Sequence, residues 1–418
     1  MFKKISYSTG INIYQNFVSL IVFLITAHLY GSEGRGIIAA STQILTLICA
    51  IVGLSLGRVL PYLLVDSKLS KEDFFQKNFY TYFITCCGSM LLAFLGVFVL
   101  NNINSVFGEL DFKYLLISMV ALPYFLWSNT SIFVFSTANL LVKQSSVILI
   151  NRSVYLFAVI ILVYVVKLPI TSFLVIMSII NLLQFFSEIR IIQTTFNPIL
   201  KFNSAFFKKL LSNALKIHPD TVASLSYSSF ITVVVNKMMT LKDVGNFSFA
   251  LQIVVLINII PTIINQYNIS LITEKGVEAS WSTQKKYIFR ALGIMVVAVI
   301  FALIGYSLMI SLFKLESFEE SIPVFRILCL AVLPNAFATL MNSRWLTEGK
   351  FKQLSIISII TGCISFIMSY QLVKHYSLTG AAISCVISYV IAALVNIVFF
   401  IYTNRKYSKR IAVVGLNN

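Results

Sequence analysis

The chain has 418 residues, of which 58% are hydrophobic and 11% are charged, and its mean hydropathy is +0.89. Soluble domains average about 45–50% apolar and about 25% charged residues, so this composition excludes a soluble globule, a secreted disulfide scaffold and a disordered chain. There is enough apolar sequence for about twelve spans of about twenty residues each. The sequence therefore predicts an all-α polytopic membrane protein.

Twelve apolar runs predict the membrane spans. A backbone in lipid must satisfy its hydrogen bonds internally, so each run should be helical. Most connections between the runs are short, which leaves no room for a soluble catalytic domain. In chain order the predicted spans lie at about 10–30, 37–62, 79–101, 113–140, 145–166, 169–192, 214–237, 245–273, 287–312, 322–346, 353–373 and 378–402.

The basic residues predict the orientation of these spans. The net charge of +17 does not require a nucleic-acid partner, because cytoplasmic loops accumulate Lys and Arg. If the N-terminus is cytoplasmic, 22 Lys and Arg residues fall inside, 7 outside and 3 within spans, and the longest inside loop carries Lys201, Lys208 and Lys209. We therefore expect both termini to be cytoplasmic.

Landmarks recur along the chain at a nearly constant offset. Gly34 and Gly245 follow the first spans of the two halves 211 residues apart, and Pro123 and Pro334 lie at the same offset. A Lys-Gln pair opens the next span in each half, 209 residues apart. Two halves of six spans each would be related by an axis along the membrane normal. The predicted organisation is an N-terminal half at 1–192, a basic cytoplasmic linker at 193–213, a C-terminal half at 214–403 and a cytoplasmic tail at 404–418.

With this organisation the chain resembles the Wzx-type polysaccharide flippases of the MOP exporter superfamily, which also contains the MATE antiporters. The resemblance covers essentially the whole chain and rests on the loop Gly31–Gly36, its counterpart Asp243–Gly245 and the turn Gly349–Lys350–Phe351–Lys352. It implies a V-shaped bundle with a central cavity between the halves. It also implies alternating access that moves an undecaprenyl-diphosphate-linked oligosaccharide, such as an O-antigen or capsular repeat unit, to the outer leaflet of a bacterial cytoplasmic membrane. A polysaccharide polymerase and a chain-length regulator are the implied partners.

Polar residues on the first span could recognise sugars. Asn12, Gln15, Asn16 and Ser19 share one helical face, and in the resembled family this span lines the cavity. The alternative is that these side chains bond neighbouring helices, as Asn, Gln and Ser do in membranes.

The seventh span repeats this pattern with Asp220, Ser224 and Tyr227 on one face. A buried carboxylate at Asp220 could take a proton or Na⁺ and couple transport to an ion gradient. The competing hypothesis is a static partner of Arg58 or Arg152. Glu188 is expected to be interfacial, and His218 to be structural.

Three arginines lie within predicted spans: Arg58, Arg152 and Arg326. Each costs about 2.5–3.5 kcal/mol at the bilayer centre unless it meets water or a partner. Guanidinium matches the paired oxygens of a diphosphate, and Arg58 and Arg152 should lie about 8–10 Å from their cytoplasmic ends. At that depth the side chains could instead snorkel to the headgroups. Arg35 is expected to be a solvated charge in an outer loop.

Three functions compete for this pattern. The sequence has no P-loop, no zinc-ligand spacing and no nucleophile elbow, which favours a transporter without cofactor or metal over an enzyme. A lipid-linked oligosaccharide flippase fits the excess of intramembrane arginine over carboxylate. A MATE-like ion-coupled antiporter and a membrane-embedded polysaccharide polymerase are the alternatives.

Overall fold

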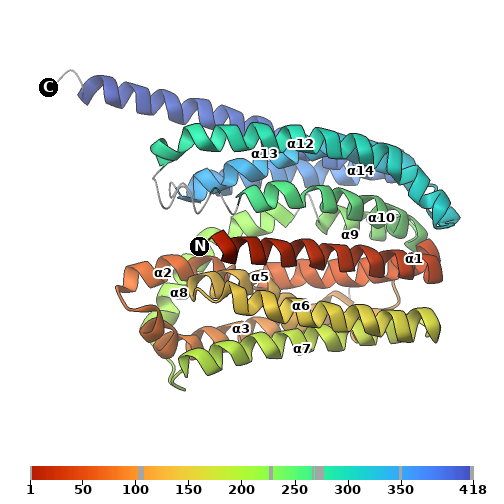
Figure 1. Ribbon diagram of the computed structural model, residues 1–418, viewed down its shortest axis with the longest axis horizontal. Coiled ribbons are helices and arrows are strands. Elements are labelled where there is room, and N and C mark those ends of the chain that lie inside the picture. The colour runs from red at the N-terminus through yellow and green to blue at the C-terminus, as the bar shows by residue number, and fades with distance from the viewer. Residues whose placement is uncertain are drawn as a thin grey trace.

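The protein is a bundle of long helices that lie roughly side by side along its longest axis (Figure 1). The computed structural model describes residues 2–101, 108–225, 229–265, 268, 277–347 and 351–414. Throughout these ranges the ordered elements are helical and none is a strand. The all-α prediction is therefore confirmed.

The helices begin and end where local chemistry allows. Thr240 and Asp243 form a reciprocal capping box at the start of α10, which satisfies amide groups that a helix start leaves without partners. The elements are α1 (Phe2–Val52), η1 (Leu56–Val59), α2 (Leu60–Ser67), α3 (Lys71–Asn101), α4 (Phe112–Met119), α5 (Leu122–Thr137), α6 (Leu141–Ala158), the π-helix η2 (Val159–Val165), α7 (Ile170–Phe196), α8 (Ser204–Leu225), α9 (Ser229–Met238), α10 (Leu241–Ile257), α12 (Val277–Leu312), η3 (Glu316–Phe318), α13 (Ser321–Thr347) and α14 (Phe351–Val414).

Two of the longest elements are hairpins. In α1 the backbone breaks at Gly31 with φ 64°, and the Arg35 Nη1 donates to Thr26 Oγ1 at 3.1 Å. In an unbroken helix these two residues would be about 13 Å apart, so the chain reverses between them. In α14 the break is at Ser377 with φ 53°. We call the end of the bundle with these breaks the hairpin end, and the end with α2 and the start of α8 the basic end.

The two hairpins help to explain why fewer apolar helices are found than the number of predicted spans. By length and composition, 8 helices among the described residues could cross a membrane, or up to 9 if α4 and α5, bent by 55°, form one span. Because α1 and α14 each count once in that set but reverse midway, each supplies two crossings. Within the described residues the other predicted spans lie on a helix, on one arm of a hairpin or on a broken or consecutive helix pair, but the predicted span 37–62 extends beyond the end of α1 at Val52 into η1 and the start of α2. The broken seventh span is α8 followed by α9.

A reciprocal glycine contact joins α1 to α10 near the hairpin end. A Cβ at Gly36 would collide with the carbonyl of Leu241, and a Cβ at Gly245 would collide with the carbonyl of Ser32. Small residues let membrane helices approach this closely. The two contacts exchange when the chain is shifted by 209 residues. The repeat seen in the sequence is therefore also a spatial symmetry here, at 209 residues rather than the 211 expected from Gly34.

This contact yields a first testable prediction. Gly245→Ala should force α1 and α10 apart, because the added methyl meets a backbone carbonyl that no rotamer can move. In purified protein, a cysteine at Ser32, which is buried, should then react with a water-soluble thiol reagent about threefold faster or more. Gly305→Ala is the matched control, since nothing lies within 4 Å of that position. Unchanged reactivity in Gly245→Ala would contradict the close approach.

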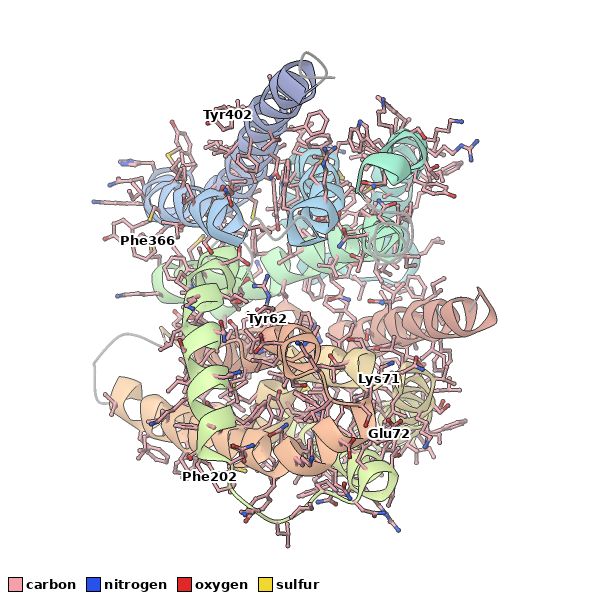
Figure 2. All side chains as sticks on the ribbon, turned by 90° about the vertical axis from the view of Figure 1, so that its left-hand side faces the viewer. Tyr62, Lys71, Glu72, Phe202, Phe366 and Tyr402 are labelled. Atoms are coloured by element: carbon pink, nitrogen blue, oxygen red, sulfur yellow. The ribbon has the colours of Figure 1, made fainter. Side chains whose placement is uncertain are left out.

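The helix α8 connects the two sequence halves at the basic end. Figure 2 shows it crossing from the helices near Phe202 toward those that carry Phe366 and Tyr402. Its first turns bury Phe206 and Leu210 in a core formed with α2, α3 and α5. The predicted linker 193–213 is thus mostly helical, and non-helical chain is confined to 197–203. Most residues of this linker therefore belong to helices rather than to a loop.

Candidate functional site

An ion pair joins the two sequence halves at the basic end. The Nη1 of Arg58 lies 2.6 Å from the Oδ2 of Asp220, and their side chains are 21% and 8% exposed. The other carboxylate oxygen of Asp220 accepts a hydrogen bond from Ser358 of α14 at 2.7 Å. One carboxylate therefore ties η1, α8 and α14 together.

The local sequence fixes where Arg58 points. After α1 ends at Val52, Leu54 and Ser55 adopt positive φ values of 51° and 54°, and the chain tightens into η1. Gly57 packs so closely against Thr130 of α5 that a Cβ would collide with it. This turn presents the Arg58 side chain to α8 instead of continuing the α1 direction.

Hydroxyl groups extend the ion pair into a network, which we call the latch: Ser55, Arg58, Asp220, Thr221 and Ser358. Arg58 also donates to Thr221 Oγ1 at 2.8 Å, and Ser55 donates to the same oxygen at 2.7 Å. The Oγ of Ser55 lies 3.3 Å from Nδ1 of His218. The sequence leaves open whether Asp220 pairs with Arg58 or Arg152, and the structure selects Arg58.

Arg152 lies apart from the latch and deeper in the bundle. Because α6 begins at Leu141 rather than at the expected 145, Arg152 lies about 16 Å along the helix, not 8–10 Å. Its Nη2 donates to the hydroxyl of Tyr124 at 3.0 Å, and its Nε is buried without a hydrogen-bond partner.

The first span contacts α6 through Tyr14, which lies on the side of α1 away from the predicted polar face. Tyr14 of α1 and Ser153 of α6 share a hydrogen bond at 2.7 Å, and Gln15 and Asn16 are half-buried. The side chain of Asn12 lies outside the described residues, as do the side chain of Ser224 and the whole of Tyr227. In the turn Gly349–Lys352 the backbone is described only from Phe351 onward.

Arg326 does not join the other two arginines. It is exposed on α13, five residues after that helix begins at the hairpin end. The structure therefore brings Arg58 to Asp220, places Arg152 against Tyr124, and leaves Arg326 at the opposite end of the bundle.

Two sequence expectations are wrong. Glu188 is not interfacial: it is 1% exposed and accepts hydrogen bonds from Trp127 Nε1 at 2.8 Å and from Gln184 Nε2 at 2.9 Å. Arg35 is not a solvated loop charge, because its guanidinium lies 3.8 Å from the centre of the Phe23 ring. The reversal at Gly31 folds it back along the first arm of α1.

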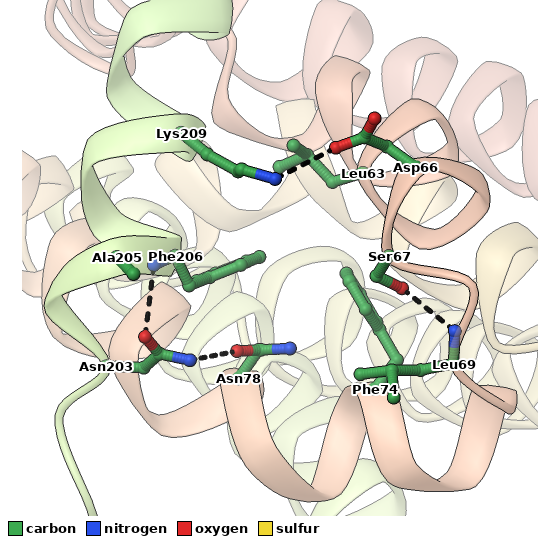
Figure 3. A pocket seen from close by; sticks show the side chains of 10 residues that line it. All are labelled: Leu63, Asp66, Ser67, Leu69, Phe74, Asn78, Asn203, Ala205, Phe206 and Lys209. Carbon is green, nitrogen blue, oxygen red and sulfur yellow. Dashed lines mark hydrogen bonds and ion pairs between the residues drawn. The ribbon is translucent and has the colours of Figure 1, made fainter.

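A surface hollow of about 200 Å³ lies at the basic end between α2, α3 and α8 (Figure 3). Lys209 bridges its mouth to Asp66 at 3.1 Å, and Asn203 donates to Asn78 at 3.0 Å. None of the predicted site residues lines it. Among the described residues, no cluster of three or more His, Cys, Asp or Glu could hold a metal ion.

Comparison with known proteins identifies the fold. Neither a protein-family model nor the sequence of a curated protein matches this chain. The solved structure of the lipid II flippase MurJ, in an inward closed conformation, matches with a TM-score of 0.73 and 13% identity over 94% of this chain and 87% of MurJ. An inward-facing multidrug resistance MATE transporter matches at 0.68 and 16% identity over 94% and 95% of the two chains.

A third solved structure points the same way. The MATE multidrug transporter DinF-BH matches with a TM-score of 0.69 and 14% identity over 96% of this chain and 95% of its own. At these identities the likeness concerns the fold and not the substrate. The superfamily part of the sequence resemblance is confirmed as a fold, and the Wzx-type assignment stays a prediction. This polytopic chain has the MATE-like fold of the MOP superfamily transporters.

Proposed function

We propose that this protein is a flippase that moves an undecaprenyl-diphosphate-linked oligosaccharide across a bacterial cytoplasmic membrane. The observation that carries the proposal is the part-buried guanidinium of Arg152, about 16 Å along α6, whose Nε is buried without a hydrogen-bond partner and whose Nη2 donates to the neutral hydroxyl of Tyr124. A charge so deep in lipid is expensive and marks a substrate path. A cation there suits an anionic substrate such as a diphosphate.

In the proposed alternating access, the latch and the contact between Gly36 and Gly245 are the two contacts that close the opposite ends of the bundle. In the proposed cycle the Arg58–Asp220 pair holds the basic end closed, and the contact of Gly36 and Gly245 holds the hairpin end closed. Opening one end while the other stays shut would expose the wall that carries Arg152 first to one leaflet and then to the other. The proposed membrane-normal axis and central cavity between the halves 1–192 and 214–403 fit this cycle.

The proposed orientation places the basic end in the cytoplasm. Lys68, Lys71 and Lys209 lie there, as the positive-inside bias requires. Both termini are then cytoplasmic, and the substrate enters from the leaflet where lipid-linked glycans carry their cytoplasmic diphosphate. A polysaccharide polymerase and a chain-length regulator would act on the product in the opposite leaflet.

A MATE-like ion-coupled antiporter is the second candidate. The buried carboxylate Glu188 favours it, because a carboxylate in an apolar core can bind a proton or a cation. Against it, Trp127 and Gln184 already donate to both Glu188 oxygens. Hydrogen-bond donors on both oxygens leave little room for a metal cation.

Export assays test the flippase. In cells that depend on this protein for a surface glycan, Arg152→Ala should lower surface glycan about tenfold or more and accumulate lipid-linked repeat units. Arg152→Lys should restore export partly, because the lysine ammonium keeps the positive charge but lacks the paired N–H donors of the guanidinium. Arg326→Ala is the control, since that arginine is exposed at the other end. Full export by Arg152→Ala, at normal protein levels, would contradict the proposal.

A further inference from the structure

The chain between α7 and α8 folds back along α3 instead of leaving the bundle. Asn197, with φ 45°, ends α7, and the ring of Phe196 stacks on that of Phe75 with their centres 4.9 Å apart. Further along α3, the hydroxyl oxygen of Thr81 accepts a hydrogen bond from the amide of Asn203 at 2.8 Å. Between these two contacts the chain therefore advances about 9 Å toward the middle of the bundle.

A hydrogen bond to α3 also holds the start of this connection. The amide of Ile199 donates to the carbonyl of Gln76 at 2.9 Å, and the amide of Lys201 donates to the carbonyl of Ile199 at 2.8 Å. A hydrogen bond between residues two apart closes a three-residue turn, which has Leu200 at its tip. We call Ile199–Phe202 the α7–α8 loop.

The α7–α8 loop exposes three large apolar side chains in succession. Leu200 is 81% exposed, Ile199 49% and Phe202 46%. Figure 2, which looks at the basic end, shows Phe202 at the outer edge of the bundle. A contiguous apolar surface of this kind marks a site of contact with a membrane or another protein, and the outer edge of a spanning bundle is the side that lipid surrounds.

The level of the loop along the bundle matches the edge of the membrane. The loop lies beside residues 76–81 of α3, and the predicted third span begins at about residue 79. The start of α3 at Lys71 lies about 12 Å further out than that residue. The loop therefore lies where headgroups meet acyl chains, the depth at which interfacial segments bury their apolar side chains.

The charges around the loop are all positive. Lys201 lies within it, and Lys77 and Lys208 come from the stretches of α3 and α8 that it contacts. All three lysines are exposed, and none forms an ion pair with a described residue. The sequence contains no Asp or Glu in 74–81 or in 197–208. This surface therefore complements an anionic headgroup.

We propose that the α7–α8 loop is a membrane-surface anchor whose partner is an anionic phospholipid of the cytoplasmic leaflet. Leu200 and Phe202 insert among the upper parts of the acyl chains. The ammonium groups of Lys77, Lys201 and Lys208 contact the phosphate of the headgroup. The anchor holds the start of α8, the helix that joins the two sequence halves. It goes beyond the proposed function, since it requires that the basic end be cytoplasmic and requires no particular substrate.

Tryptophan fluorescence tests the insertion. Full-length Leu200→Trp is placed in lipid nanodiscs, and the emission of the wild type is subtracted. Lipids brominated high on their acyl chains should quench the added tryptophan by about half or more, and aqueous iodide should quench it little. Leu69→Trp is the matched control: that leucine is 36% exposed in the turn before α3, so iodide should quench it and brominated lipid should not.

The opposite result has a definite meaning. Quenching of Leu200→Trp by iodide and not by brominated lipid would overturn the anchor, and would leave the loop as a water-exposed surface for a protein partner. If Leu200→Trp does not fold, Phe202→Trp must meet the same requirement. Neither readout involves a transported glycan, so failure of the anchor leaves the flippase standing.

The same reporter tests the choice of lipid. Brominated phosphatidylglycerol, diluted in unlabelled phosphatidylcholine, should quench Leu200→Trp more than the same fraction of brominated phosphatidylcholine. Lys77→Gln, Lys201→Gln and Lys208→Gln should each lower the enrichment of phosphatidylglycerol about fivefold. Lys374→Gln, which removes an exposed lysine near the hairpin end, should leave it unchanged. Equal quenching of Leu200→Trp by the two brominated lipids would overturn the assignment of an anionic lipid.

Discussion

Replacing Arg58 by alanine should abolish export of the lipid-linked glycan and also destabilise the protein. The substitution removes the proposed first contact of the diphosphate at the basic end. It also leaves Asp220, whose side chain is 8% exposed, as a buried carboxylate without its cation. Breaking a buried pair from one side costs about 3–5 kcal/mol, and the 21% exposure of Arg58 favours the lower end of that range.

A double-substitution cycle separates the two roles of Arg58. In Arg58→Ala with Asp220→Ala no charge is left without its partner, so thermal stability in detergent should recover by about 1–3 kcal/mol relative to Arg58→Ala alone. Export should stay absent, because the cation for the diphosphate is still missing. Asp220→Asn alone should keep substrate binding but release the latch. If the double variant recovers export together with stability, Arg58 is a structural partner and not a substrate contact.

Collapse of the membrane potential should slow outward flipping strongly. A diphosphate carries roughly two negative charges, and each is worth about 2.3 kcal/mol per 100 mV across the full potential. With the cytoplasm negative, outward movement of this anion gains about 4–5 kcal/mol per 100 mV if the protein's own charges stay in place. The potential can therefore drive the loaded step without a carboxylate that titrates.

Vesicles with imposed gradients measure this effect. A K⁺ diffusion potential of the physiological sign should accelerate flipping, whereas a pH gradient alone should change it much less. Asp220→Asn should keep the dependence on potential, because in the proposed cycle Asp220 holds Arg58 and is not the coupling group. Flipping that ignores the potential but requires a pH or Na⁺ gradient would favour the ion-coupled antiporter.

The spans were predictable because hydropathy directly reports the requirement that a lipid-embedded backbone be apolar and helical. The reversals at Gly31 and Ser377 fall in the predicted gaps between spans, but the sequence did not predict that the chain stays helical up to each break, so that residues assigned to the loop lie on the second arm. This single unseen feature explains why Arg35 was misplaced. The sequence locates it in a loop, whereas the reversal lays it against Phe23 twelve residues earlier.

Depth was the second quantity that the sequence misjudged. Polar residues at the start of α6, such as Gln144 and Ser145, made the span seem to begin later than it does. Both are 7% exposed inside the protein, since Gln144 donates to Ser131. Buried polar groups thus shortened the apparent span and made Arg152 look shallow. Glu188 was also misjudged, because its partner Trp127 comes from a separate helix that only the fold brings to it, while Gln184 lies one turn earlier on the same helix.

Asp220 shows how far the sequence alone predicts the partner of a charged residue. A carboxylate within a membrane span predicts either an ion pair with Arg58 or Arg152 or an ion-coupling role, because an isolated charge there is unfavourable. Which arginine pairs with Asp220 depends on the turn at Leu54 and Ser55. Both residues have positive φ values, and because neither is a glycine the sequence gives no sign of this turn. The pairing with Arg58 leaves Arg152 without an ion pair to a described residue, and on this arginine the proposal of an anionic substrate depends.

Reconstituted vesicles test the central claim, that the transported species is a lipid-linked diphosphate, most directly. Purified protein in liposomes is given a fluorescent isoprenyl-diphosphate-linked oligosaccharide, and its appearance in the opposite leaflet is followed by a membrane-impermeant quencher. A lipophilic cationic dye is followed in parallel. We predict that the wild type moves the anionic lipid and not the dye, and that Arg58→Ala and Arg152→Ala move neither. Movement of the dye without the lipid would contradict the claim.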